Sequence, residues 1–233
     1  MQYELIPVGV DGCRGGWCVV CSAEVWCVAT FAELLEKVGE AAVIAVDMPI
    51  GLLDRAAAGG RACDREARRI LGPGRASTVF SPPVRPALDA ASYGEALRIN
   101  RETSPERIGI SKQAYNLFAW IRDLDSVLAH RPKQRIVEAH PELAFQALNG
   151  NRPLATKKRT TAGRCQRTAL LKDAGYHWIE AALGRPPKGA TREDVLDATV
   201  LCWTAQRVAQ GTACHVPKTP AYDSRGLPMA IWW

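Results

Sequence analysis

Three short apolar runs in this chain each lead to a carboxylate. The residues before Asp11, Asp47 and Glu138 read VGV, VIAV and IV. Continuous apolar runs of this kind are typical of central strands that are covered on both faces. Neighbouring strands would bring the three carboxylates to one edge of a sheet. Since open α/β sheets bind ligands outside the carboxyl ends of their strands, we expect the functional site at this edge.

The first 50 residues predict most of a mixed sheet. Glycines after Asp11 predict a tight turn, so that residues 5–10 and 17–21 form a hairpin and residues 25–28 add a third antiparallel strand. Thr30 and Glu33 are spaced as a capping box for a short helix. The strand ending at Asp47 then lies parallel to the first through a right-handed crossover.

A change in composition marks residues 52–107. Gly-Gly, Gly-Pro-Gly and Pro-Pro pairs interrupt this stretch, and Arg61, Arg65 and Arg68 recur at helical spacing within it. We interpret it as an arginine-rich insertion or cap after the fourth strand, within a single domain that spans residues 1–233.

Four further segments predict helices, and two predict strands. Helical spacing of apolar residues covers 111–129, shorter patterns cover 141–148 and 168–174, and a long helix runs from about 191 to Gly211. A strand at 136–139 completes a sheet of five, and the last eight residues, 226–233, are predicted to dock as a short strand.

Composition narrows the class of protein. No apolar run reaches the roughly 20 residues that span a bilayer, and the first five residues lack the pattern of a signal peptide. The eight cysteines include a single CxxC pair, Cys18 and Cys21, and no second pair matches it as a zinc site would need, so we expect reduced, mostly buried thiols. We therefore expect a cytoplasmic protein with no membrane partner. The net charge of +6 favours polyanions such as nucleic acid.

Two more acids lie in the last long helix. Asp194 and Asp197 are three residues apart, which places them on one face of that helix. Together with the strand-end acids they would repel one another unless cations neutralise them. Mg²⁺ and Mn²⁺ prefer oxygen ligands. Two such ions about 4 Å apart activate a water and stabilise the leaving oxygen in phosphodiester cleavage.

Each acid also has a purely structural explanation. Asp11 precedes Gly12 and is a good turn former, and Asp47 precedes a proline-containing turn. Glu138 has many arginines as potential partners, and Asp194 suits the positive end of a helix dipole. His140 is better explained as a hydrogen-bonded loop residue than as a metal ligand.

The chain resembles a known family, the predicted RNase H-like nucleases catalogued as domain of unknown function 429. The blocks that carry the resemblance cover essentially the whole chain and read GVDG at 9, DMPIG at 47, CDxxAR at 63, GPGRASTVF at 72, GISKQAYN at 109, EAHPE at 138, LNG at 148 and DxxD at 194.

The resemblance implies an RNase H-like fold, distantly similar to RuvC-type resolvases. Those enzymes carry one acid on the first strand, one on the fourth and a pair in the last helix, which correspond to Asp11, Asp47, Asp194 and Asp197. Aspartate stands on the fourth strand where resolvases tend to carry glutamate, and neither Glu138 nor the arginine-rich insertion belongs to the resolvase pattern.

The leading hypothesis is a nuclease that binds Mg²⁺ or Mn²⁺. Asp11, Asp47 and Asp197 would hold the metal, and Glu138 and Asp194 would assist. The side chains expected to contact phosphates are those of Arg61, Arg65, Arg68, Lys112, Lys157 and Lys158. Solvated or ion-paired surface is the alternative explanation of these basic residues.

Two other functions stay open. Actin-like ATPases and sugar kinases also begin with a Gly-x-Asp-x-Gly pattern, although they need two such domains and a second phosphate loop. A non-catalytic nucleic-acid-binding or regulatory protein is the third hypothesis. The sequence leaves open DNA against RNA and whether the chain forms a homodimer.

Overall fold

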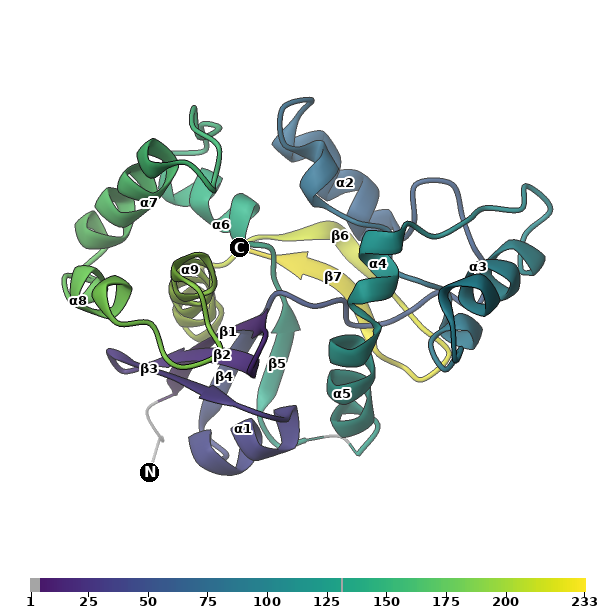
Figure 1. Ribbon diagram of the computed structural model, residues 1–233, viewed down its shortest axis with the longest axis horizontal. Helices are drawn as coiled ribbons and strands as arrows, with labels where there is room; N and C mark the ends of the chain where they lie inside the picture. The colour runs from purple at the N-terminus through teal and green to yellow at the C-terminus, as the bar shows by residue number, and fades with distance from the viewer. Residues whose placement is uncertain (1–4, 131) are drawn as a thin grey trace. The chain divides into compact units, whose positions relative to one another are not determined.

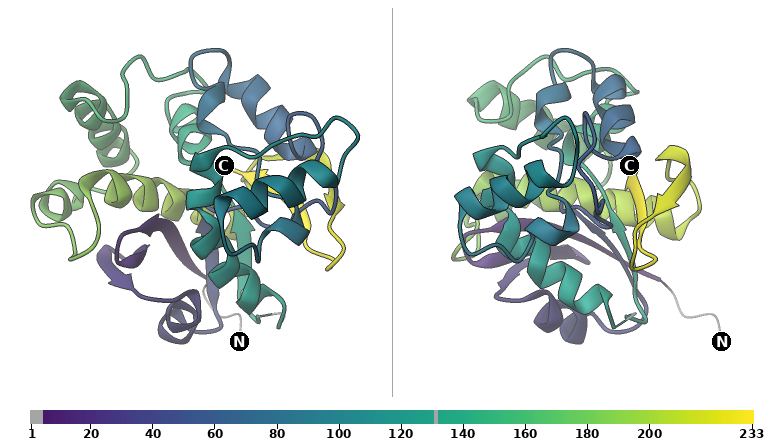
Figure 2. Two further views of the ribbon diagram at one scale, coloured as in Figure 1. Left: turned by 45° about the vertical axis from the view of Figure 1, so that its right-hand side comes forward. Right: turned by 90° about the vertical axis from the view of Figure 1, so that its right-hand side faces the viewer.

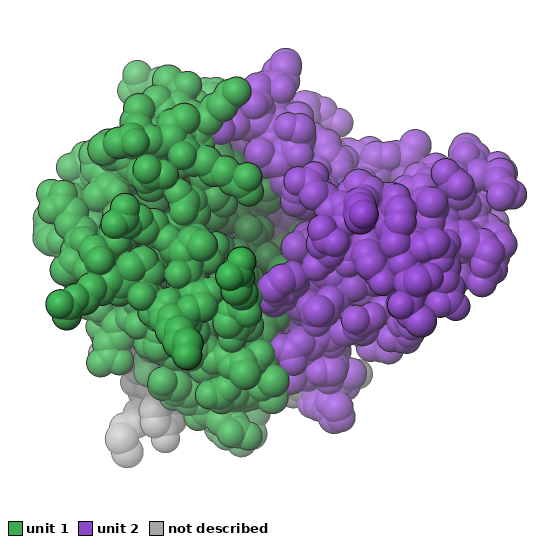
Figure 3. Space-filling view, viewed as in Figure 1, with its two compact units in different colours: residues 1–48, 132–214, 232–233 green, residues 49–131, 215–231 purple. Residues whose placement is uncertain are grey.

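The structure, a computed structural model, describes residues 5–130 and 132–233 in two compact units. Unit 1 comprises Met1–Met48, Pro132–Cys214 and Trp232–Trp233, and unit 2 comprises Pro49–Arg131 and His215–Ile231 (Figure 3). Unit 2 includes the predicted insertion and extends beyond it. Residues 1–4, on which the signal-peptide expectation partly depends, lie outside the described residues.

Unit 1 is built on a five-stranded mixed sheet with the order β3-β2-β1-β4-β5. The strands β1, β2 and β3 pair antiparallel, whereas β4 and β5 run parallel to β1. The predicted sheet is thus confirmed in its number, order and direction of strands. The bounds are β1 Ile6–Cys13, β2 Gly16–Cys21, β3 Glu24–Val28, β4 Ala42–Val46 and β5 Arg135–Glu138.

Helices cover both faces of this sheet. The longest helix, α9, lies across β1, β2 and β4 on one face, and α1 lies on the other (Figures 1 and 2). On the α1 side, Trp17 and Phe31 meet edge to face with ring centroids 5.1 Å apart. The helices of unit 1 are α1 Phe31–Val38, α6 Pro141–Leu148, α7 Thr161–Asp173, α8 Ile179–Gly184 and α9 Arg192–Ala209.

Helix capping follows the sequence closely. The Thr30 hydroxyl accepts a hydrogen bond from the Glu33 amide, as predicted, while the Glu33 carboxylate accepts from Ala29 rather than from Thr30. The helix predicted at 168–174 begins earlier, at Thr161. Thr160 caps it by accepting from the amide of Gly163, three residues on.

Unit 2 contains short helices and a hairpin. Its elements are α2 Ala62–Leu71, η1 Ala76–Thr78, η2 Arg85–Ala87, α3 Tyr93–Glu102, α4 Lys112–Asn116, α5 Phe118–Leu128, β6 His215–Tyr222 and β7 Pro228–Trp232, with Trp232 itself in unit 1. The single helix predicted over 111–129 is two helices. The amide of Leu117 bonds Ala114, three residues back, so the turn tightens there.

No helix in residues 5–130 or 132–233 has both the length and the hydrophobicity that a membrane crossing requires.

Candidate active site

A close helix–strand crossing sets the geometry of the site. A Cβ on Gly9 would lie 1.9 Å from the carbonyl oxygen of Ala198 and 2.2 Å from the amide nitrogen of Cys202. Only glycine lets the backbones of β1 and α9 approach this closely. Because strand side chains alternate between faces, Asp11 points to the same face as Gly9. Asp197, the residue before Ala198, therefore lies beside it.

Asp11 is the most strongly perturbed acid of the site. Its side chain is buried, with 8% of the residue exposed. Burial raises the pKa of Asp11 well above its usual range, and the negative charges of Asp197 and Asp47 raise it further. Lys158 opposes this rise. The pKa of Asp11 thus reports three carboxylates in one electrostatic neighbourhood, as the leading hypothesis requires.

Asp47 directly follows β4, and its amide bonds the carbonyl of Val10 in β1 at 3.0 Å. Burial raises its pKa as well. His140 and Lys158 lower that pKa, whereas Glu142 adds to the rise. The strand order therefore brings the fourth-strand acid beside the first-strand acid.

Asp197 is the third member and is 1% exposed. Its pKa is raised to about 6, first by burial and then by Asp47 and Glu142. Its Oδ2 accepts a hydrogen bond from the Lys158 ammonium, which limits the rise. Its Oδ1 is buried and has no hydrogen-bond partner among the described residues.

Asp194 and Glu138 lie differently from these three. Asp194 caps α9: its Oδ2 accepts from the Thr191 amide at 2.7 Å, and its own amide bonds the Thr191 hydroxyl. Its charge still raises the pKa of Asp11. Glu138 pairs with Val46, the neighbour of Val10, so the pleat directs it to the sheet face opposite Asp11. The assisting roles of Asp194 and Glu138 stay predictions.

Glu142 was not among the predicted site residues, although it lies in the EAHPE block. It forms a buried ion pair with Arg167 of α7. Arg167 also bonds the carbonyl of Gly163 at 3.2 Å and lies over the ring of Phe145. The Glu142 charge also raises the pKa values of Asp47 and Asp197. A signal was available in the chain, since an acid follows His140-Pro141 at the start of a buried helix.

The predicted phosphate contacts divide between the units. Arg61, Arg65, Arg68 and Lys112 belong to unit 2, and the carboxylates belong to unit 1. The guanidinium of Arg61 is buried against Asp64 at 2.7 Å and bonds the carbonyls of Ile50 and Gly51, which is a structural role.

Arg65 and Arg68 also bond within unit 2. Arg65 donates to the carbonyl of Gly60, and Arg68 donates to those of Gly59 and Val79. Lys112, at the start of α4, is exposed. Phosphate binding by these three residues stays a prediction.

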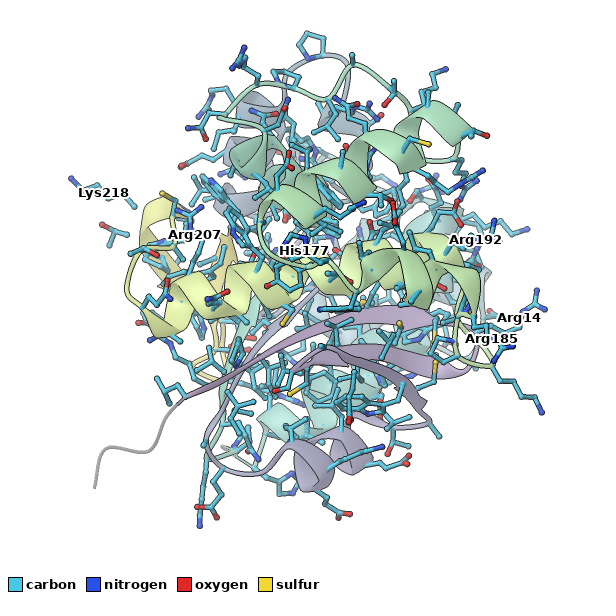
Figure 4. All side chains as sticks on the ribbon, turned by 90° about the vertical axis from the view of Figure 1, so that its left-hand side faces the viewer. Arg14, His177, Arg185, Arg192, Arg207 and Lys218 are labelled. Carbon is cyan, nitrogen blue, oxygen red and sulfur yellow. The ribbon has the colours of Figure 1, made fainter. Side chains whose placement is uncertain are left out.

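Unit 1 has exposed cations of its own near the start of α9. Figure 4 shows Arg14, Arg185 and Arg192 at that end of the helix, and all three are exposed. The turn that contains Arg14 is held to the segment before α9 by a hydrogen bond from the Gly15 amide to the Gly189 carbonyl. Lys157 and Arg159, on the turn that carries Lys158, are exposed too. Lys158 is the one of these lysines and arginines whose charge acts on the pKa values of Asp11, Asp47 and Asp197 among the described residues.

The donor set fits a divalent cation chemically. Asp11, Asp47 and Asp197 supply oxygen ligands, and one ammonium leaves their combined charge negative. The buried Oδ1 of Asp197 is a free lone-pair donor among the described residues. As the side chains stand in residues 5–130 and 132–233, no three His, Cys, Asp or Glu groups meet in an arrangement that could hold a metal ion. The Lys158 ammonium forms an ion pair with Asp197.

Three thiols lie beside the acids, a feature that their scattered positions in sequence conceal. Asp11, Cys18 and Cys27 are register partners on β1, β2 and β3, and the Cys13 and Cys27 sulfurs are 3.8 Å apart. A hydrogen bond from Cys18 lowers the pKa of Cys27 to about 7. All eight cysteines are free.

Comparison with known proteins gives one match. A family model described as "Protein of unknown function (DUF429)" matches residues 9–221. No curated protein and no solved structure matches significantly. The matched range contains every carboxylate of the site and Lys158.

Proposed function

The chain belongs to the DUF429 family, and from this premise we propose that it is a metal-dependent nuclease that hydrolyses phosphodiester bonds. The observation that carries the proposal is the gathering of Asp11, Asp47 and Asp197 in one electrostatic neighbourhood at the carboxyl ends of β1 and β4. Carboxylates that repel each other in a buried site are costly, and a functional site is the usual reason to keep them.

In this proposal Asp11, Asp47 and Asp197 hold one or two Mg²⁺ or Mn²⁺ ions. Such ions activate a water and stabilise charge on the leaving oxygen. Burial of Asp11 and Asp197 keeps the ligand oxygens away from competing water. Lys157, Arg159 and Arg192 would contact the phosphate backbone, which is negatively charged at every nucleotide. We further propose a cytoplasmic location, which the free cysteines support, because reducing compartments keep thiols unpaired.

The test is cleavage of single-stranded DNA, duplex DNA, a four-way junction and RNA in Mg²⁺ and in Mn²⁺. We expect Asp11→Asn to abolish cleavage while circular dichroism stays unchanged. Asp173→Asn, an exposed aspartate of α7, is the matched control and keeps full activity. Wild-type rates in folded Asp11→Asn would reject the assignment. Tight binding with no cleavage under either metal would favour a binding protein, and stabilisation by ATP would favour a nucleotide-binding protein.

A further inference from the structure

Lys158 stands on a turn whose backbone is anchored firmly. The carbonyl of Lys157 accepts hydrogen bonds from the Thr160 amide at 3.1 Å and from the Thr160 hydroxyl at 2.8 Å. A Cβ on Gly163 would lie 1.9 Å from the same carbonyl oxygen, so α7 begins in direct contact with the turn. The Thr156 hydroxyl donates to Gln166 of α7 at 2.6 Å. The turn therefore cannot shift without moving α7.

Helix α7 is in turn held to α6 by a buried ion pair. Arg167 is fully buried and bonds Glu142. Breaking a buried pair of this kind is strongly destabilising, because a charge is left without compensation. The base of Lys158 is thus fixed relative to the acids, and the freedom that remains lies in its flexible four-carbon side chain.

The ammonium of Lys158 occupies the mouth of the carboxylate cluster. Its side chain is 37% exposed, whereas that of its partner Asp197 is 1% exposed. Burial lowers the pKa of Lys158, but the attraction of Asp197 and Asp11 outweighs this and holds it above its usual value. The amine is therefore charged at neutral pH. It neutralises part of the cluster and has solvent on its other side.

A single ammonium does not satisfy this cluster. It bonds Asp197 Oδ2, while Oδ1 of the same carboxylate keeps no hydrogen-bond partner among the described residues. Asp11 and Asp47 keep raised pKa values despite the ammonium. A divalent cation would bring twice the charge and could accept electrons from both Asp197 and Asp11, so the two cations compete for the same oxygens.

We propose that the ammonium of Lys158 is a built-in counter-ion that a divalent cation must displace from Asp197, and that phosphate then receives it. This inference depends on the proposed function, because it names how the same site is loaded. A displaced amine on an anchored turn stays close to the metal, where a phosphate group would lie. Since coupling between two ligands is reciprocal, phosphate should tighten metal binding and the metal should tighten phosphate binding.

The test measures free Mn²⁺ by electron paramagnetic resonance, with no turnover involved. We expect Lys158→Met to bind Mn²⁺ at least fivefold more tightly than the wild type, because the competing charge is gone. Lys157→Met removes the same charge from the same turn and should change the affinity less than twofold. Lys158→Arg keeps a cation and should bind Mn²⁺ no more tightly than the wild type.

Phosphate coupling is measured in the same titrations with a phosphorothioate dinucleotide. The wild type should bind Mn²⁺ several-fold more tightly in its presence, and Lys158→Met should lose that gain. Lys158→Gln repeats the charge removal in case the methionine variant does not fold. If Lys158→Met and Lys158→Gln both fold and bind Mn²⁺ no more tightly than the wild type, the inference about Lys158 is overturned, while the proposed function stands. Wild-type Mn²⁺ affinity in Asp197→Asn would instead overturn the metal site, and with it the proposed function.

Discussion

Single residues of this protein show what the site costs. Asp11, Asp47 and Asp197 are each removed from water, and each has its pKa raised, with burial as the first cause. A raised pKa means that ionising the acid costs more free energy in the folded state than in water. The ionised carboxylates therefore destabilise the folded protein at neutral pH.

Asp11→Asn should consequently stabilise the metal-free protein at neutral pH. Because the folded state holds the Asp11 proton more firmly than the unfolded state does, the free energy of unfolding falls as pH rises above the unfolded pKa of about 4. Asparagine does not ionise, so its advantage over aspartate should be larger at pH 8 than at pH 5. Urea unfolding in EDTA at both pH values measures this. A variant less stable than the wild type at pH 8 would contradict the explanation, and Asp173→Asn provides the baseline.

At the scale of elements, glycines control two contacts of the site. Gly9 allows α9 to cross β1 closely enough to bring Asp197 beside Asp11, and Gly163 allows α7 to start against the turn of Lys158. Neither Gly9 nor Gly163 has a positive φ. The need for glycine at these positions therefore comes from the close approach of neighbouring backbone atoms and not from an unusual backbone conformation. Backbone contacts therefore position α9 and α7, and the positions of these helices determine where their side chains lie.

Gly163→Ala should therefore cost about 1–3 kcal/mol of stability, since the added methyl group meets a backbone carbonyl that can move only with the turn. Gly184→Ala is the matched control. Gly184 ends α8, has open space where a Cβ would lie, and should stay within about 0.5 kcal/mol of the wild type. Urea unfolding of both variants gives the difference. Equal stability of the two variants would show that the turn accommodates the methyl group freely.

At the scale of the whole molecule, charge is distributed in a way that suits a polyanion. The chain carries a net charge of +6, and the buried acids Asp11, Glu138, Glu142 and Asp197 belong to unit 1. Lys157, Arg159 and Arg192 of the same unit are exposed. In the proposed function, such exposed cations would attract phosphates, and the carboxylates would hold the metal.

Nucleic-acid binding should then weaken steeply with salt. The logarithm of the affinity is expected to fall linearly with the logarithm of the salt concentration, because each phosphate contact releases counterions. Lys157→Gln should make this slope shallower by about one unit, because one phosphate contact is lost. Fluorescence anisotropy in Ca²⁺ between 50 and 200 mM salt measures both slopes. An affinity that is unchanged over this range would exclude phosphate contacts as the source of binding.

The sequence predicted the fold more completely than it predicted the arrangement of the site. Apolar runs, turn glycines and caps are local signals, and they predict the sheet order and most helices correctly. The break at Leu117 was missed because apolar spacing continues through both α4 and α5. Glu138 was expected beside Asp11 because its strand is a neighbour, but a one-residue difference in register directs it to the other face.

The sequence by itself determined which residues are candidates for the chemistry: acids at strand ends, acids on one helix face and a pair of lysines near α7. Only the tertiary structure decided which of them meet. Asp11, Asp47 and Asp197 come together because α9 crosses β1 at Gly9, and Lys158 joins them because α7 is held by Arg167 and Glu142. Asp11 and Asp197 are nearly 190 residues apart in sequence, and they meet only because the helices and strands pack together. No local pattern in the chain predicts such a contact.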